Sequence, residues 1–221
     1  MFGLDLKRIF RFLFLMVVFD LACISSTLLQ TPRSELIGQG SKLIMKDTVI
    51  TQAPTGAMKY LGKFKVTFYW IVRETDFNGS KDTPLYLENG KLLGYFDYDF
   101  VQAFKKEACA ELKSGKCISY MKRVNRVGIV SQFLGVNGYT ISPFQSVAVD
   151  PSEIALGSKL YIPALTKMSE KPNNGIVYAH DIGSMINGNS IDIFVGHKEN
   201  TRLLTAAGIE SSSLIDIYLL E

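Results

Sequence analysis

The alternation of apolar and polar positions along the chain predicts a mainly β protein. Residues 63–73 carry the longest period-two face, and residues 190–195 alternate so that Asp192 and Phe194 lie opposite three aliphatic side chains. Short apolar runs bounded by turn residues predict further strands at 117–130, 144–149, 159–162, 176–181 and 214–220. Many short strands with glycine and proline turns are typical of a small closed barrel.

Between the first and the later strands, the pattern of apolar positions changes over residues 75–138. Asn89-Gly90 between two apolar runs predicts a hairpin with a type I′ turn. Apolar residues at helical spacing predict a helix over 98–112, with Gly115 as its stop. A second, short helix is predicted over 199–207.

The N-terminal residues 1–25 resemble an export signal. Three basic residues precede an apolar run at 12–19, which is shorter than the roughly 20 residues that a membrane-spanning helix needs. Leu21-Ala22-Cys23 resembles the end of a bacterial lipoprotein signal, so lipidation at Cys23, cleavage near Ser25 and an uncleaved anchor all stay open. Residues 26–62 are predicted to be a tether with an edge strand at 41–51, followed by the barrel at 63–221.

Composition limits the function classes. With 221 residues and 47% hydrophobic content, the chain can bury one core with appendages and is not a disordered protein. A net charge of +3 is too balanced for a nucleic-acid partner. The two histidines lack helical metal-ligand spacing and no glycine-rich phosphate loop is present, so we expect no metal and no cofactor. We also expect the protein to be a monomer.

Two of the cysteines, Cys109 and Cys117, lie close together in the sequence. In an exported protein they could form a disulfide across a small loop. The alternative is a pair of free thiols, because the sequence does not supply the Cα separation that a disulfide requires.

Three aspartates stand at ends or inside predicted strands. Asp150 ends an apolar run and precedes proline, which indicates a helix N-cap. Asp181 ends a strand and runs into a glycine turn. Asp192 lies within a strand beside Phe194, so its carboxyl is either solvated or in a cleft.

These segments resemble a known family. Ala148-Val-Asp150-Pro with the following Leu-Gly-Ser-Lys-Leu-Tyr-Ile-Pro, and then Ala179-His-Asp181-Ile-Gly with Gly188-Asn-Ser-Ile-Asp192-Ile-Phe, resemble the three-aspartate or 3D domain. The resemblance implies a six-stranded double-psi β-barrel, here with a small α/β insertion at about 75–138. Such a barrel forms the catalytic part of membrane-bound lytic murein transglycosylases.

The resemblance also implies site roles and a partner. Asp192 matches the family's catalytic acid, and Asp181 would support it. Glycan contacts or structural roles fall to the remaining aspartate and to nearby aromatic residues: Asp150, Tyr139, Tyr161, Tyr178 and Phe194. The substrate would be peptidoglycan glycan strands, cleaved at the β-1,4 bond to a 1,6-anhydro product. The protein would then reside in the bacterial periplasm or envelope, with possible anchoring through its N-terminus.

Two other functions fit parts of the sequence. A non-catalytic glycan-binding or envelope-scaffold module could use the same barrel, because one fold hosts both enzymes and binders. Asp181-Ile-Gly-Ser also resembles the aspartic protease turn. Those enzymes need two such aspartates in one site, so this single copy would require a homodimer.

Overall fold

The structure is a computed structural model that describes residue 54, residues 56–171 and residues 173–221. The predicted export signal, the lipidation site Cys23, the tether at 26–40 and the edge strand at 41–51 lie outside the described residues. Within the described part of the chain, no helix is both long and apolar enough to cross a membrane.

Six strands pair in a closed ring. Starting from β1, the order is β1, β10, β7, β9, β8 and β11, and β11 pairs with β1 again. The β1–β10 and β7–β9 pairs are parallel and the other four are antiparallel. The strands of the ring are β1 (Met58–Arg73), β7 (Ser146–Val149), β8 (Lys159–Tyr161), β9 (Ile176–Asp181), β10 (Ser190–His197) and β11 (Leu214–Leu220).

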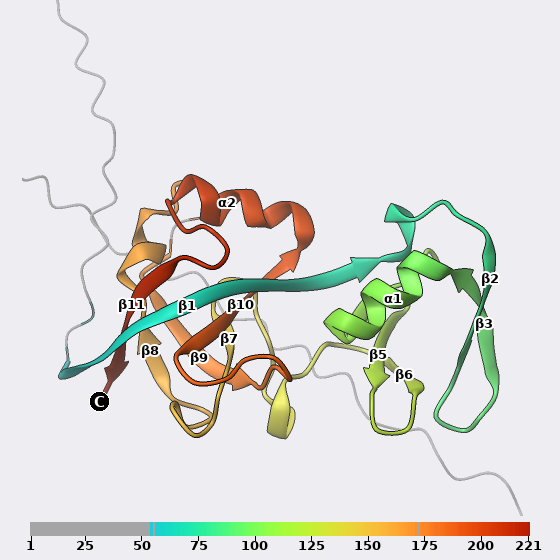
Figure 1. Ribbon diagram of the computed structural model, residues 1–221, viewed down its shortest axis with the longest axis horizontal. Coiled ribbons are helices and arrows are strands. Elements are labelled where there is room, and N and C mark those ends of the chain that lie inside the picture. The colour runs from blue at the N-terminus through green and yellow to red at the C-terminus, as the bar shows by residue number, and fades with distance from the viewer. Residues whose placement is uncertain (1–53, 55, 172) are drawn as a thin grey trace, which may run out of the picture. The chain divides into compact units, whose positions relative to one another are not determined.

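The ring encloses an aliphatic core. Val66, Ile191 and Ile193 are fully buried there, as the period-two patterns predict. Helix α2 (Thr201–Ala206) follows the short 3-10 turn η4 (Lys198–Asn200) and contributes Leu203 and Leu204 to the same core. A further 3-10 turn, η3 (Pro163–Lys167), follows β8. Figure 1 shows α2 lying against the strands of the ring.

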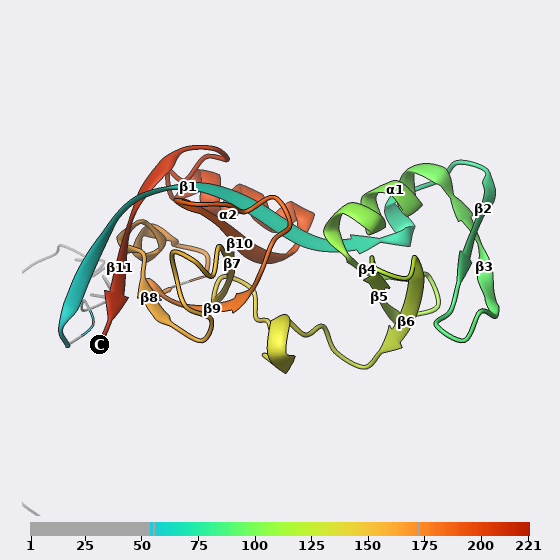
Figure 2. The same cartoon turned by 60° about the horizontal axis from the view of Figure 1, so that its bottom comes forward.

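Strand β1 begins at Met58, before the predicted start at residue 63, and serves two sheets. Its first part pairs with β10 and β11, and its last residues, Val72 and Arg73, pair with β4 in the insertion. Figure 2 shows β1 running from the ring strands to the insertion. The partly buried Trp70 packs against the cores of both.

The insertion has a core of its own, which includes the fully buried Phe100, Phe104 and Ile118. Phe100 and Phe104 stack with ring centroids 6.1 Å apart. The elements of the insertion are η1 (Glu74–Asp76), β2 (Lys81–Tyr86), β3 (Leu92–Asp97), α1 (Tyr98–Glu107), β4 (Cys109–Glu111), β5 (Cys117–Met121), β6 (Arg126–Val130) and η2 (Val136–Gly138).

Helix α1 is shorter than predicted. Asp97 caps its start, accepting hydrogen bonds from the backbone N–H groups of Asp99 and Phe100. Ala108 takes the left-handed conformation, with φ of 62°, and ends the helix. Of the two apolar residues that continued the helical spacing, Ala108 is this cap, and Leu112 is buried just after strand β4, as Ala110 is within the strand. Their burial in a sheet overrides the local helical spacing.

The predicted hairpin at Asn89-Gly90 is present between β2 and β3, but its turn is not type I′. Among the described residues only Gly90 of this pair has a positive φ, whereas a type I′ turn needs both. The Gly90 N–H donates to the carbonyl of Leu87, and the Leu87 N–H donates to that of Lys91. The loop is therefore one residue longer than a two-residue turn, with glycine in the left-handed position.

The possible disulfide is not formed. Cys109 and Cys117 are both free thiols. In the β4–β5 ladder Cys109 faces Ser119 and Cys117 faces Glu111, so the cysteines are diagonal neighbours. Diagonal side chains in an antiparallel pair lie about 7–8 Å apart, which is too far for a disulfide without moving the backbone.

Candidate active site

Two of the predicted aspartates lie in one row that crosses four strands. Asp192 on β10 pairs with Thr67 on β1 and, on its other side, with Ala148 on β7. Ala148 in turn pairs with Asp181 on β9. The register of the β7–β9 pair shifts between Val147 and Ala148, and the buried Ala148 lies on the strand between those of the two aspartates. The two backbones are about 9–10 Å apart, which is two strand spacings.

The pKa of Asp192 is unusually high for an aspartate. Burial raises its pKa to about 6, against the opposing effect of a hydrogen bond that Thr67 Oγ1 donates to Asp192 Oδ1 over 2.8 Å. The nearby carboxyls of Glu107 and Asp181 contribute to this rise. Asp192 can therefore carry a transferable proton in mildly acidic solution and release it near neutrality.

Asp181 is a second buried carboxyl beside Asp192. Burial raises its pKa, and hydrogen bonds from the Ile182 backbone, the Tyr69 side chain and the Val136 backbone oppose that rise. The Ile182 N–H donates to Asp181 Oδ1 over 2.9 Å. Asp181 is thus fixed by the turn that follows β9 and by the loop that leaves the insertion.

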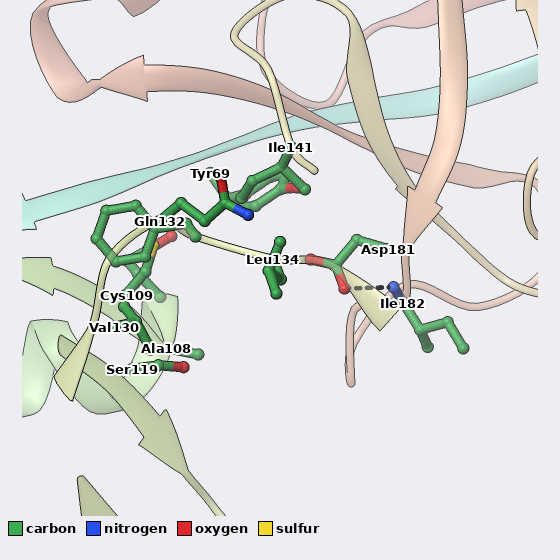
Figure 3. A pocket seen from close by; sticks show the side chains of 12 residues that line it. Tyr69, Ala108, Cys109, Ser119, Val130, Gln132, Leu134, Ile141, Asp181 and Ile182 are labelled. Carbon is green, nitrogen blue, oxygen red and sulfur yellow. Dashed lines mark hydrogen bonds between the residues drawn. The ribbon is translucent and has the colours of Figure 1, made fainter. Parts of the chain in front are cut away.

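A pocket of about 240 Å³ opens next to this row and is lined by both the ring and the insertion. Figure 3 shows Asp181 and Ile182 on one side, Ala108, Cys109, Ser119 and Val130 on the other, and Leu134 between them. Asp192 itself does not line the pocket, although Asp181 and Glu107, the two carboxyls that act on its pKa, do.

Sequence reasoning missed Glu107, the last residue of α1. Its side chain is 7% exposed and lines the pocket, and burial raises its pKa. Lys106 Nζ lies 3.6 Å from its carboxylate. The predicted helix over 98–112 gave no reason to place this residue near Asp192. Only the left-handed stop at Ala108 brings the end of α1 to the pocket.

Tyr69 on β1 was also missed. It pairs in register with Phe194, and its ring packs against that phenylalanine at 5.0 Å between centroids. Tyr69 is 9% exposed and lines the pocket. Burial raises its pKa, and Asp181 adds to the effect, so the phenol stays protonated. The carboxyl of Asp181 lies close to the buried Tyr69 hydroxyl and opposes its ionisation.

Asp150 has a structural role. Asp150 Oδ1 accepts hydrogen bonds from the N–H and hydroxyl of Ser152, and Oδ2 accepts one from the Gly188 N–H over 2.7 Å. These bonds lower its pKa. The two bonds from Ser152 cap the turn after Pro151, as predicted. The bond from Gly188 connects that turn to the loop before β10. Asp150 does not line the pocket.

The predicted aromatic contacts also lie outside the pocket lining. Tyr139 and Tyr178 stack against the ring of His180, with centroids 4.7 Å and 5.3 Å away. Tyr161 instead packs near Tyr218 on β11. Phe194 is 2% exposed and packs against Tyr69, so of the two roles predicted for it the structure supports the structural one.

Comparison with known proteins identifies the region that holds the later strands of the ring. A family model described as the 3D domain matches residues 145–219. The predicted resemblance to the 3D domain is confirmed. The matched segment contains all of β7 to β10, most of β11 and the three aspartates. Among curated proteins, none matches the chain.

Solved structures extend the likeness beyond the 3D domain. The crystal structure of Escherichia coli MltA with bound chitohexaose has a TM-score of 0.53 and 14% identity, covering 72% of this chain and 72% of that one. A membrane-bound lytic murein transglycosylase from Agrobacterium tumefaciens has a TM-score of 0.49 and 15% identity, covering 72% of this chain and 73% of its own. The chain is thus mainly β, with a fold similar to that of the Escherichia coli protein.

Proposed function

We propose that this protein is a lytic transglycosylase that cleaves the β-1,4 bond between N-acetylmuramic acid and N-acetylglucosamine in peptidoglycan. The observation that carries the proposal is Asp192. It is a buried carboxyl with a pKa raised to about 6, positioned by Thr67 beside a pocket. The 3D domain match and the fold similarity to Escherichia coli MltA support the assignment of substrate class.

In the first step, protonated Asp192 donates its proton to the glycosidic oxygen as the bond from that oxygen to the anomeric carbon breaks. The raised pKa supplies the proton, and the developing positive charge on the sugar is stabilised by the resulting carboxylate. Asp181, with its backbone-fixed carboxyl two strands away, adds negative potential and orients the site.

In the second step, the 6-hydroxyl of the muramic acid attacks the anomeric carbon and transfers its proton to the Asp192 carboxylate. The product is a 1,6-anhydro sugar, water is not consumed, and Asp192 is again protonated. An enzyme that uses water or a covalent intermediate needs two carboxyls in defined roles. Here the substrate's own hydroxyl replaces the water, so one acid that becomes a base suffices.

The ring of six paired strands supports the inference of a double-psi β-barrel. In this arrangement residues 63–221 form the barrel with the insertion at about 75–138. We further propose that the protein is exported to the bacterial envelope and acts as a monomer. Cell fractionation and the mass of the mature chain test export and lipidation at Cys23, and sedimentation tests the monomer.

The function is tested by incubating the full chain with purified peptidoglycan and analysing the products by mass spectrometry. We expect anhydro-muropeptides from the wild type and none above background from Asp192→Asn, with glycan binding retained. Asp181→Asn should reduce the rate less. A wild type that binds glycan without releasing anhydro products would exclude the enzyme and leave the glycan-binding module as the function.

A further inference from the structure

The end of helix α1 is bonded to one residue of β1, Trp70. The register of the β1–β10 pair shifts between Tyr69 and Ile71, so Trp70 lies at an irregularity of that ladder. The Trp70 backbone N–H donates a hydrogen bond to the Glu107 carboxyl. The Cys109 thiol donates to the Trp70 carbonyl over 3.5 Å. Both backbone groups of Trp70 are therefore bonded to the corner of the insertion that joins α1 to β4.

We propose that Glu107 is a positioning residue for the catalytic acid: its negative charge, brought to β1 by the end of α1, keeps the Asp192 carboxyl protonated. The inference rests on the proposed function, in which Asp192 must carry a proton before it can donate one. It gives the insertion a part in the chemistry that neither step of the reaction assigns to it. Glu107 acts through Asp192 and needs no contact with the sugar.

The carboxyls of Glu107 and Asp192 are bonded to nearby points of the same strand. Asp192 accepts a hydrogen bond from Thr67 Oγ1, and Glu107 accepts one from the backbone three residues later. Three residues of a strand span about 10 Å. Two partly buried like charges at such a separation shift each other's pKa by roughly 0.3–1 unit, because the protein screens them less than water does.

Two lysines favour the ionised form of Glu107. Burial raises the pKa of its carboxyl, and the charge of Lys106, whose Nζ lies 3.6 Å away, is the largest effect that opposes the rise. Lys198 on η4 acts in the same direction, with its Nζ 5.6 Å from the centroid of the Trp70 ring. Glutamine would accept the Trp70 hydrogen bond without the penalty of burying a charge. That hydrogen bond alone therefore does not account for a carboxyl at this position.

The groups that face Asp192 make it the carboxyl that keeps the proton. Burial raises its pKa to about 6, the hydrogen bond from β1 opposes this, and the charge of Glu107 is the next effect and raises the pKa. Lys106 lowers the pKa and Asp181 raises it, each by a smaller amount. The Tyr69 phenol, which also responds to the charge of Asp192, stays protonated. Loss of the Glu107 charge should let Asp192 release its proton at a lower pH.

The test is Glu107→Gln, which keeps the shape of the side chain and the acceptor for the Trp70 N–H but removes the charge. The full chain is labelled with ¹³C at its aspartate carboxyls, and the Asp192 signal is assigned by its absence from Asp192→Asn. An NMR titration then gives the pKa of Asp192 without any turnover. We expect this pKa to fall by about 0.5 unit in Glu107→Gln, because one like charge is lost.

The matched control is Glu111→Gln, the same change four residues later in the insertion. Glu111 pairs with Cys117 in the β4–β5 ladder and lies outside the pocket lining. This control should move the pKa of Asp192 by less than about 0.1 unit, because a distant exposed charge is screened.

The pH profile of cleavage is the second readout. Glu107→Gln should match the wild type near pH 4.5 and be about threefold slower near pH 7, because half a pKa unit changes the fraction of the acid form by that factor. A purely structural role for Glu107 would lower the rate by the same factor at both pH values.

Three results overturn the proposal: an unchanged pKa of Asp192 in Glu107→Gln, an equal rate loss at both pH values, or a variant that does not fold, which would assign the charge to structure. Failure of the proposed function is read separately, because the titration needs no turnover. A shifted titration in a protein that releases no anhydro product refutes the cleavage reaction alone. Product release with an unshifted titration refutes the role of Glu107 alone.

Discussion

Replacing Asp192 by asparagine should abolish catalysis and, at neutral pH, stabilise the fold. The folded pKa of about 6 lies above the ordinary 3.8, so the folded state binds the proton more tightly than the unfolded state does. Below pH 3.8 the carboxyl is protonated in both states and has no cost. Between pH 3.8 and 6 the unfolding free energy falls, because keeping the carboxyl buried becomes more costly as the unfolded state ionises. Above pH 6 this cost is constant. A shift of about two pKa units corresponds to roughly 3 kcal/mol.

Asparagine has the same shape and stays neutral, so it removes this cost. We expect Asp192→Asn to match the wild type in unfolding free energy near pH 3.5 and to exceed it by about 2–3 kcal/mol at pH 8. Chemical denaturation of both proteins at the two pH values measures the difference. Thr67 Oγ1 can still donate to the asparagine carbonyl, so its hydrogen bond does not confound the comparison.

The same substitution that raises stability should lower activity. The variant should lose roughly 10²–10⁴ in the rate of anhydro-product release while still binding glycan. Wild-type activity should decline about tenfold per pH unit above pH 6, because the acid form is titrated away. If the variant is no more stable than the wild type at pH 8, burial does not disfavour the ionised form of the Asp192 carboxyl. Wild-type cleavage rates in the variant would remove Asp192 from the mechanism.

Three further predictions concern the supporting structure. Asp150→Ala should lower the unfolding free energy through its lost turn cap, with the cleavage rate per folded molecule unchanged; a large rate loss would contradict a purely structural role. Gly135→Ala should destabilise by about 1–3 kcal/mol, because its Cβ would lie 2.1 Å from the carbonyl oxygen of His180, and Gly135→Ser should do no better. A reductant should leave the Tm unchanged because Cys109 and Cys117 are free, whereas a drop would indicate a disulfide.

Local patterns in the sequence predicted most of the ring. The bounds of β9 and β11 agree with prediction, because each is a short apolar run between turn residues. The alternation in β10 placed Ile191 and Ile193 in the core and Asp192 on the opposite face, since a period of two is a property of the strand itself. The family resemblance then selected Asp192 from among the carboxyls.

The pocket could not be predicted in this way, because residues far apart in the sequence make it. Glu107 reaches it only because the burial of Ala110 and Leu112 in and beside a strand ends α1 early. Tyr69 lies on the face of β1 opposite the one that the strong aromatic alternation marked as core. A weak signal was present, since Thr67 and Tyr69 share that second face at a spacing of two.

The sequence by itself determined the strands, their inward faces and the chemical identity of one acid, because these depend on neighbours within a few residues. Only the tertiary structure decided what surrounds that acid. The parallel pairing of β1 with β10 sets Thr67 beside Asp192, and the pairings of β7 set Ala148 between Asp192 and Asp181. Burial by these long-range contacts raises the pKa, and the sequence alone contains no measure of burial.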